Sequence, residues 1–309
     1  MRRRAIVAAL LAALVAIGCG GSDEAATAAD EADADAASSR PIRIGTKNFT
    51  EQYVLGELYR QALEAEGFPV QLKRDIGSSE IVHRALTGGG LDMYPEYVGV
   101  LLSEVAGDRQ RPRTAEAAYQ RAKVYEEERG FTLLAMTPFT DSNALAVTDD
   151  FARRRGVTRI PELKSAPGGP VRIAAPPEFR TRFEGLLGLR AIYGLRDVEL
   201  EPLRIGAQYD ALDRGEVDAA AIFTTDGQLA ARRYVLLEDP EELFAAQHVA
   251  PVIDRDTLEA HGPGLARAID SVSRRLTTRA MREMNAAVDL DGEEPAAVAE
   301  RFLTAEDLL

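Results

Sequence analysis

A pattern that occurs twice in the chain constrains its fold more than any other feature. Residues 85–92 read ALTGGGLD and residues 211–218 read ALDRGEVD, so an Ala-Leu pair, a glycine and an apolar-Asp pair recur at the same spacing. Tyr97 and Phe223 each stand five residues after the repeated Asp. A helix, a turn, a strand and an aromatic residue repeated in the same order predict two half-alike lobes.

Around both copies, apolar residues alternate between the period of short strands and the period of amphipathic helices. In the first lobe, strands are expected at 42–45 and 70–75, and between them a helix that Thr50 caps and Gly67 ends. The other expected elements are a helix from Ser78 to the glycines at 88–90, a helix at 114–129, strands at 131–135, 144–148, 171–174 and 198–203, helices at about 181–193 and 209–212, and helices from 254 to 309. Alternating strands and helices predict an α/β fold.

The first residues have the features of a secretory signal. Three arginines at 2–4 precede an apolar stretch at 5–17, which is too short to span a bilayer as a helix. Gly18 and Cys19 follow, and small residues before a lone cysteine resemble the lipobox of bacterial lipoproteins, with Ala16 where that motif usually has Leu. The resemblance implies a signal peptide at 1–18 and a lipidated Cys19. The alternative is a secreted protein that is cleaved elsewhere.

The segment after this cysteine is low in complexity. Residues 20–39 consist mainly of Gly, Ala, Ser, Asp and Glu, so burial cannot offset the entropy lost on ordering, and residues 19–40 are expected to be a lipidated cysteine and a disordered acidic tether. Removal of 1–18 takes away three of 37 basic residues and none of 50 acidic ones, which changes the net charge from -13 to -16. Such a chain is not expected to bind nucleic acid or anionic lipid electrostatically. Cys19 is the only cysteine, so no internal disulfide can form.

Residues 91–100, LDMYPEYVGV, predict a strand that ends beside two tyrosines. In open α/β sheets, ligands bind where strands end, so Tyr94 and Tyr97 are candidates for one wall of a site, and the alternative is that both are core aromatics. Lys47 lies between the first strand and helix of lobe one, and Arg182 lies near the start of the matching helix of lobe two. Two cations near helix N-termini favour an anionic group between the lobes, and the alternative is that both are solvated charges.

Five separated motifs together resemble the substrate-binding proteins of osmoprotectant ABC importers, which bind glycine betaine, choline, carnitine or related quaternary amines. The motifs are GTKNFTEQYVLG at 45–56, DMYPEYVG at 92–99, ALAV at 144–147, PEF at 177–179 with Arg182, and FTTDG at 223–227. The resemblance implies a type II periplasmic-binding-protein fold with crossing segments near 141–144 and 223–226. Lobe one would comprise 41–142 plus 226–309, and lobe two 143–225. It also implies an extracytoplasmic monomer that works with a permease and its ATPase, anchored to the cell membrane through its N-terminal lipid alone.

The family's chemistry identifies candidate ligand-binding residues. A trimethylammonium group has no N–H to donate and is instead surrounded by aromatic rings, while a carboxylate at the other end of a betaine attracts cations. Carried over by position, Lys47 and Arg182 match the two cations, and Tyr97 and Tyr209 match two cage tyrosines. Three residues depart from the pattern. Phe223 occupies the position of a third cage tyrosine, Asn143 that of the fourth, and Val100 that of a carboxylate-binding Thr.

These departures weaken the expectation of a glycine betaine site. Loss of one cation-π contact, about 0.5 to 2 kcal/mol, and of one charge-assisted hydrogen bond, about 1.5 to 3 kcal/mol, predicts on the order of 10 to 1,000-fold weaker binding of betaine. Asn143 also leaves room for a larger ligand, for which carnitine and ergothioneine are candidates.

Two further classes of function stay open from the sequence, a ligand sensor on the same fold and an enzyme. The three histidines lack metal-ligand spacing and no Gly-x-Ser-x-Gly elbow occurs, so no cofactor or metal is expected.

Overall fold

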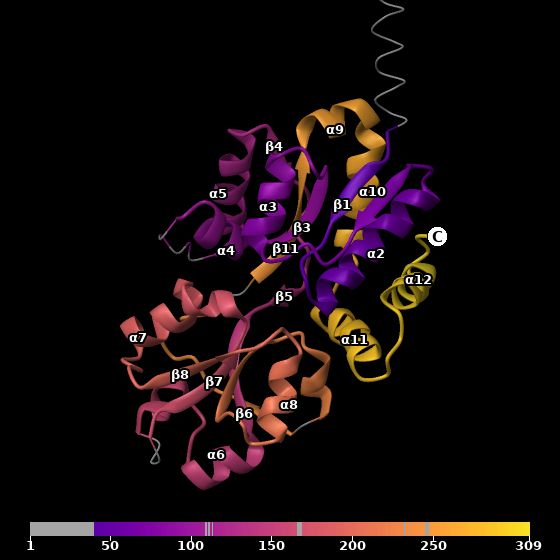
Figure 1. Ribbon diagram of the computed structural model, residues 1–309. Helices are drawn as coiled ribbons and strands as arrows, with labels where there is room; N and C mark the ends of the chain where they lie inside the picture. The colour runs from indigo at the N-terminus through magenta and orange to yellow at the C-terminus, as the bar shows by residue number, and fades with distance from the viewer. Residues whose placement is uncertain are drawn as a thin grey trace, which may run out of the picture. The chain divides into compact units, whose positions relative to one another are not determined.

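The computed structural model describes residues 40–108, 110, 112, 114–165, 169–231, 233–244 and 247–309. The predicted signal peptide, Cys19 and the acidic tether lie outside these described residues. Figure 1 shows an upper lobe and a lower lobe, each built on one sheet. This two-sheet α/β architecture confirms the predicted fold class.

The first lobe is built on a mixed sheet with the order β2-β1-β3-β11-β4, and β5 pairs with β11 outside this path. β1, β2 and β3 are parallel, and β11 runs antiparallel to β3, β4 and β5. Its strands are β1 (Ile42–Gly45), β2 (Val70–Lys73), β3 (Met93–Tyr97), β4 (Phe131–Leu133), β5 (Thr140–Asp141) and β11 (Gln247–Asp254).

The second lobe repeats this plan. Its sheet has the order β10-β6-β9-β7-β8, in which β7, β8 and β9 are parallel and β6 runs antiparallel to β9. Its strands are β6 (Asn143–Thr148), β7 (Val171–Ala175), β8 (Val198–Pro202), β9 (Ala219–Phe223) and β10 (Tyr234–Leu236). The trio β8-β7-β9 thus corresponds to β2-β1-β3, as the sequence repeat predicts.

The repeated Asp residues explain why the pattern recurs. In the first lobe, Arg43 of β1 donates from Nε to Asp92 Oδ2 at 2.8 Å and from a terminal nitrogen to Asp92 Oδ1 at 2.6 Å. In the second lobe, Arg172 of β7 makes the same two bonds to Asp218, at 3.2 and 3.0 Å. Both Asp residues also accept from the backbone N–H of their Arg. Each ion pair fixes the start of the strand that ends in Tyr97 or Phe223.

Helices cover both sheets. The first lobe has α2 (Thr50–Ala65), α3 (Ser79–Thr87), α4 (Val98–Val100), which continues as a π-helical turn at Leu101–Val105, α5 (Ala115–Glu127), α9 (Arg255–His261), α10 (Pro263–Ser273), α11 (Thr278–Asp289) and α12 (Pro295–Ala305). The second has α6 (Asp149–Arg155), a π-helical turn at Phe183–Leu187, α7 (Gly188–Ile192), α8 (Ala207–Asp213) and 3-10 turns at Ile160–Ser165 and Pro177–Arg180. A further 3-10 turn at Gly227–Ala231 follows the crossing segment and packs against α11. The predicted packing of the C-terminal helices on lobe one is confirmed, because α10, α11 and α12 pack against α2.

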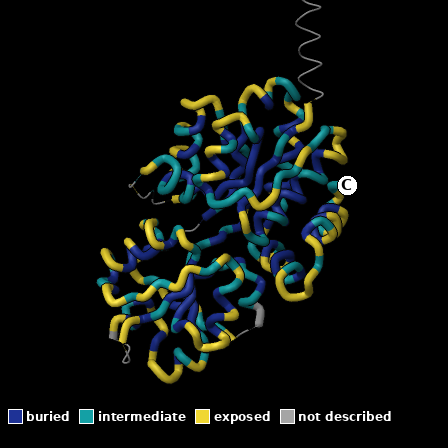
Figure 2. The backbone as a smooth tube through the Cα atoms, in the orientation of Figure 1, coloured by how far each residue is buried: buried dark blue, intermediate teal, exposed yellow. Residues whose placement is uncertain are grey.

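The first sheet is buried on both faces (Figure 2). Successive strand residues point to opposite faces, so Met93 and Tyr97 of β3 join the cluster of α2 and the C-terminal helices, while Tyr94 joins the cluster of α3 and α5. Tyr94 is therefore the core aromatic of the alternative interpretation, and its pKa is raised well above its ordinary value by burial. Tyr97, on the other face, reaches the N-terminus of α2.

The chain crosses between the lobes at the first segment that the sequence indicated. β5 belongs to the first lobe and β6 to the second, with Ser142 between them. Thr224, just after β9, donates its N–H to the Ser142 carbonyl oxygen at 2.9 Å, and Ser142 N–H donates to Thr224 Oγ1 at 2.9 Å. The predicted crossing segments, 141–144 and 223–226, therefore lie side by side.

Three expectations from the sequence differ from the structure. The assignment of all of 226–309 to lobe one does not hold for β10, which pairs with β6, or for Leu243, which is buried in the core of the second lobe. Thr50 does not cap α2, because Phe49 occupies the cap position and Thr50 Oγ1 donates to Asp289 Oδ1 at 2.6 Å. The helix expected at 181–193 is interrupted at Glu184 and Gly185, whose backbone is not helical.

Candidate ligand-binding site

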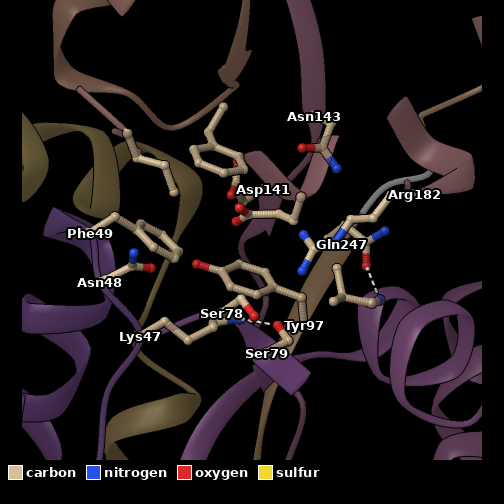
Figure 3. Close-up of a pocket in the computed structure, with 14 residues that line it drawn as sticks. Lys47, Asn48, Phe49, Ser78, Ser79, Tyr97, Asp141, Asn143, Arg182 and Gln247 are labelled. Carbon is tan, nitrogen blue, oxygen red and sulfur yellow. Dashed lines mark hydrogen bonds between the residues drawn. The ribbon is translucent and has the colours of Figure 1, made fainter. Parts of the chain in front are cut away.

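A small pocket lies where strands of both lobes end, and Figure 3 shows its lining side chains. Its volume is about 40 Å³. The residues that line it are Lys47, Asn48, Phe49, Ser78, Ser79, Tyr97, Val100, Asp141, Asn143, Glu178, Arg182, Ile205, Phe223 and Gln247. The structure thus brings together six of the seven residues indicated by the sequence: Lys47, Tyr97, Val100, Asn143, Arg182 and Phe223.

Three aromatic rings from the two lobes stack beside this pocket. Phe49 lies between the other two, with ring centroids 6.2 Å from Tyr97 and 5.3 Å from Phe223 and interplanar angles of 24° and 21°. Phe49 and Tyr97 belong to the first lobe, and Phe223 ends β9 of the second. The sequence analysis missed Phe49, although its place directly before α2, beside Lys47, was a usable signal.

Tyr97 is held by a buried carboxyl group. Its hydroxyl donates to Glu51 Oε1 at 2.6 Å, and Asn285 Nδ2 donates to Glu51 Oε2 at 3.1 Å. Burial, together with the charge of Glu51, raises the pKa of Tyr97 well above its ordinary value, so the hydroxyl stays protonated. The ring is consequently fixed at the end of β3 with one face toward the pocket.

Lys47 occupies that face of the Tyr97 ring. Its Nζ lies 4.0 Å from the ring centroid and donates to Glu96 Oε1 at 2.5 Å. It also donates to Ser79 Oγ at 3.2 Å (Figure 3). Burial lowers the pKa of Lys47, against the opposing effect of Glu96. The cation expected to bind a ligand carboxylate therefore already has a carboxylate partner within its own lobe.

Arg182 is also paired. It donates to both carboxylate oxygens of Glu80, at 3.1 and 3.0 Å, and its Nε lies 3.9 Å from Glu104 Oε2. Partial burial acts to raise the pKa of Glu80, but the charge of Arg182 and the hydrogen bonds from Ser78, the backbone and Arg182 together lower it. Because Arg182 belongs to the second lobe and both glutamates to the first, this ion pair joins the lobes across the pocket.

Val100 and Asn143, two of the residues that depart from the family pattern, are connected by a chain of hydrogen bonds. Val100 N–H donates to Gln247 Oε1 at 3.2 Å, and Gln247 Nε2 in turn donates to Glu184 Oε2 at 3.2 Å. Asn143 Nδ2 donates to the same Glu184 oxygen at 3.4 Å. Gln247, which the sequence analysis did not single out, therefore connects Val100 to Asn143.

Tyr209 is the one predicted residue outside the pocket lining. Its hydroxyl donates to Asp226 Oδ2 at 2.7 Å, and its ring contacts Tyr234 edge to face with centroids 5.1 Å apart. It is 4% exposed. The structure therefore places it beneath the site, where it holds Asp226 at the crossing segment.

A second, larger cavity of about 780 Å³ adjoins the aromatic rings. Asn48, Phe49, Ile205 and Phe223 line both cavities. Among the described residues, five acidic ones line the larger cavity, Glu51, Asp75, Asp210, Asp226 and Asp289, against a single basic residue, Arg204. We refer to it as the acidic cavity.

Buried carboxyl groups lie behind the rings. Glu51 and Asp141 are each 2% exposed, and burial raises the pKa of both, with their mutual repulsion adding to the effect at Asp141. Burial also raises the pKa of Asp226 to about 7. A cation that entered between the rings would contact the aromatic faces and favour the ionised forms of these carboxyl groups.

Within the described part of the chain, no group of three or more His, Cys, Asp or Glu side chains is arranged to hold a metal ion. The carboxylates and rings instead form an environment for an organic cation.

Comparison with known proteins identifies the family. Residues 40–305 match the substrate-binding domain of ABC-type glycine betaine transport systems. The chain belongs to this family. It is 31% identical to the glycine-betaine-binding protein of Pseudomonas aeruginosa, with 88% of this chain and 90% of that protein aligned, and 28% identical to the glycine betaine-binding protein YehZ of Escherichia coli, over 86% and 90%.

A solved structure of a glycine betaine/carnitine/choline ABC transporter component has the same fold. Its TM-score is 0.69 at 25% identity, with 86% of this chain and 99% of that chain covered. The recognition made from the five sequence motifs is therefore confirmed. As a member of the family, the chain is an extracytoplasmic binding component of an ABC importer. None of the helices in the described segments is long and apolar enough to cross a membrane.

Proposed function

We propose that the chain captures a quaternary ammonium compound between its lobes, at Phe49, Tyr97 and Phe223, and delivers it to a membrane permease driven by an ATPase. The observation that carries the proposal is the stack of three rings, to which both lobes contribute. In this stack Phe49 connects Tyr97 and Phe223, the two aromatic residues that the sequence repeat relates. A cation without N–H groups is recognised by such faces.

Capture requires the rings to separate. A volume of about 40 Å³ holds only a few water molecules, and the mutual stacking of the rings leaves no slot for a trimethylammonium group. Lys47 Nζ also covers one face of Tyr97. Because Phe223 lies on the second lobe and Phe49 and Tyr97 on the first, a hinge motion at 141–144 and 223–226 would open the stack and admit the ligand.

The charge pairing supports a ligand whose affinity does not depend on a carboxylate. Glu96 satisfies Lys47 and Glu80 satisfies Arg182, so the carboxylate of glycine betaine would have to replace one of these partners. Such an exchange gains less than binding to an unpaired cation. Together with Val100 and Asn143 in place of polar and aromatic ligand groups, this supports choline-like ligands over glycine betaine itself.

Two parts of the proposal concern the chain as a whole. We infer that Cys19 is lipidated and that the acidic tether lets the binding component reach its permease. The site is proposed to bind without chemistry, because Lys47, whose amine lies 3.2 Å from the Ser79 hydroxyl, is paired with Glu96, and the family of the chain is a substrate-binding domain.

Isothermal titration calorimetry with choline and with glycine betaine tests the proposal on three variants, Phe49→Leu, Tyr97→Leu and Phe223→Leu. Each ring removed should weaken choline binding by about 0.5 to 2 kcal/mol, or roughly 2 to 30-fold, because a branched apolar side chain has no negative face. Phe68→Leu is the matched control, since Phe68 lies outside both cavities and contacts His261 edge to face. Choline binding that survives all three pocket variants unchanged would contradict the proposal.

A further inference from the structure

A cation of the chain itself lies on the rings of the candidate site. Lys47 Nζ is 4.0 Å from the ring centroid of Tyr97 and 5.8 Å from that of Phe49, and both distances are within the range of a cation-π contact. Figure 3 shows the end of the Lys47 side chain beside the Tyr97 ring. The other cation-π contacts found among the described residues lie outside this pocket. The ammonium group therefore stands where a ligand cation would contact the aromatic faces of the first lobe.

One carboxylate fixes this ammonium group and the ring relative to each other. Glu96 directly precedes Tyr97 in β3, and its Oε1 accepts from Lys47 Nζ at 2.5 Å and from the Tyr97 backbone N–H at 2.6 Å. Ser79 Oγ is the second hydrogen-bond partner of Nζ, at 3.2 Å. Lys47 is 3% exposed and Glu96 1% exposed. Water therefore has little access to the contact between the ammonium group and the Tyr97 ring.

A ligand cation and the Lys47 ammonium group cannot share this face of the ring. A quaternary nitrogen bound to the same face of Tyr97 would come into contact with Nζ, and two cations in a site with little water repel each other strongly. Burial already disfavours the charge of Lys47 and lowers its pKa, against the opposing effect of Glu96. A second positive charge at the same place would add to this cost. The ligand must therefore move the ammonium group off the ring.

We propose that Lys47 is an internal competitor of the ligand: its ammonium group occupies the cation position of the pocket in the ligand-free chain, and capture moves it off the rings. The inference rests on the proposed function of the aromatic pocket and adds a residue that sets its affinity and specificity. Displacement of Lys47 opposes the binding of every organic cation. A ligand carboxylate recovers only part of this cost, because it exchanges one carboxylate partner of Lys47 for another.

A double variant that removes both charges of the ion pair tests the proposal. Lys47→Met leaves a flexible apolar side chain that a ligand can push aside, and Glu96→Gln avoids a buried carboxylate without a cation. The Gln oxygen can still accept from the Tyr97 N–H. Isothermal titration calorimetry should show that choline binds the double variant about tenfold tighter than the native chain, which is the size of one cation-π contact. Glycine betaine should gain less, because it also loses Lys47 as a partner for its carboxylate.

Lys123→Met with Glu127→Gln is the matched control. These two residues form a lysine–glutamate ion pair on α5, with Lys123 Nζ 3.8 Å from Glu127 Oε1, and both lie outside the two cavities. The control removes the same pair of groups at an unrelated place, so it should leave choline binding unchanged. Circular dichroism of both double variants, recorded before the titrations, shows that each is folded.

A measurement on the native chain follows the ammonium group without any substitution. The chain has four lysines, at 47, 73, 123 and 164, so a heteronuclear NMR spectrum of protein labelled at the lysine ε-methylene groups is simple to interpret. Lys47 lies over the Tyr97 ring, and the ring current should shift its signals upfield of those of the other lysines. Saturation with choline should move the Lys47 signals toward the positions of the others, because the ammonium group has left the ring.

The outcomes separate the two proposals. Equal affinities of the native chain and the Lys47→Met, Glu96→Gln variant for choline, or an equal gain in the control, would overturn the internal competitor and leave the aromatic pocket intact. Lys47 signals that keep their upfield shift at saturation with choline would do the same. If neither choline nor glycine betaine bound to the native chain or to either double variant, the proposed function would fall and the competitor with it.

Discussion

At the scale of single residues, the sequence indicated which side chains meet but not how they are paired. The pocket is lined by Lys47, Tyr97, Asn143, Arg182 and Phe223, because each lies at the end of a strand or in the segment that follows one. The carboxylates that neutralise the two cations come from positions 49 and 102 residues away in the chain. Local sequence patterns carry no information about such pairings. The sequence therefore predicted where the two cations lie, but not that each is already paired with a glutamate.

Glu126 is a second buried acid whose state the sequence did not reveal. It is fully buried, neither of its carboxylate oxygens has a hydrogen-bond donor among the described residues, and the imidazole of His83 lies beside it, with Nδ1 3.8 Å from Oε1. Burial raises the pKa of Glu126 to about 7. The folded state therefore holds a proton that the unfolded state releases near pH 4.5, and stability is lost as the pH rises between these two values.

Glu126→Gln should remove most of this loss. The amide does not ionise, so the free energy of unfolding of the variant should fall less with rising pH than that of the native chain. Between pH 5 and pH 8 the variant should gain on the order of 2 to 3 kcal/mol relative to the native chain, at roughly 1.4 kcal/mol per pKa unit. Urea denaturation at several pH values measures it. Glu128→Gln, on the exposed face of the same segment, should show no such trend. Burial lowers the pKa of His83, whose effect has the opposite sign and appears in both variants.

At the scale of elements, strands were predicted better than helix boundaries. β1 matches its expected range, and the other predicted strands differ at their ends by one or two residues. The helix expected at 181–193 failed at Gly185, where a Cβ would lie 2.3 Å from the carbonyl oxygen of Phe179. That close approach is a tertiary constraint, and the periodic apolar pattern of the segment does not record it.

Gly227 is a comparable close approach at the hinge. A Cβ at this position would lie 2.5 Å from Cα and 2.6 Å from N of Ala286 in α11, and backbone atoms cannot turn aside as a flexible side chain can. Gly227→Ala should therefore separate the hinge from α11 and cost about 1 to 3 kcal/mol of stability. Urea denaturation provides the measurement.

Gly264→Ala is the matched control for this prediction. Gly264 lies in α10, and the nearest atom to its Cβ would be a side-chain carbon of Phe68 at 3.4 Å. Alanine has a higher helix propensity than glycine, so this variant should be as stable as the native chain or more stable. Equal destabilisation by both alanines would show that the contact with α11 is not the cause.

At the scale of the whole molecule, the two-lobe plan followed from the sequence because the Arg–Asp pairs that build each lobe are encoded in a repeat. The repeat ends at Phe223, and beyond it the chain returns once more to the second sheet through β10 before it enters β11. This three-residue strand takes the position in the second sheet that β4 has in the first, but it lies outside the repeated sequence pattern and was not assigned from sequence. The lobe boundary was consequently the least predictable part of the fold.

The ion pairs of Arg182 with Glu80 and Glu104 should hold the lobes together before any ligand arrives. Nitroxide labels on Ala117→Cys in α5 and Ala191→Cys in α7, both exposed and on different lobes, would report the separation once Cys19 is replaced by Ser (Figure 1). Arg182→Ala should shift the distance distribution from pulsed electron paramagnetic resonance to longer and broader values, because a partly buried ion pair is lost and two glutamates remain.

Arg180→Ala, two residues away and exposed, removes the same charge without touching either glutamate and should leave the distribution unchanged. An unaltered distribution in Arg182→Ala would mean that the crossing segments alone set the lobe separation.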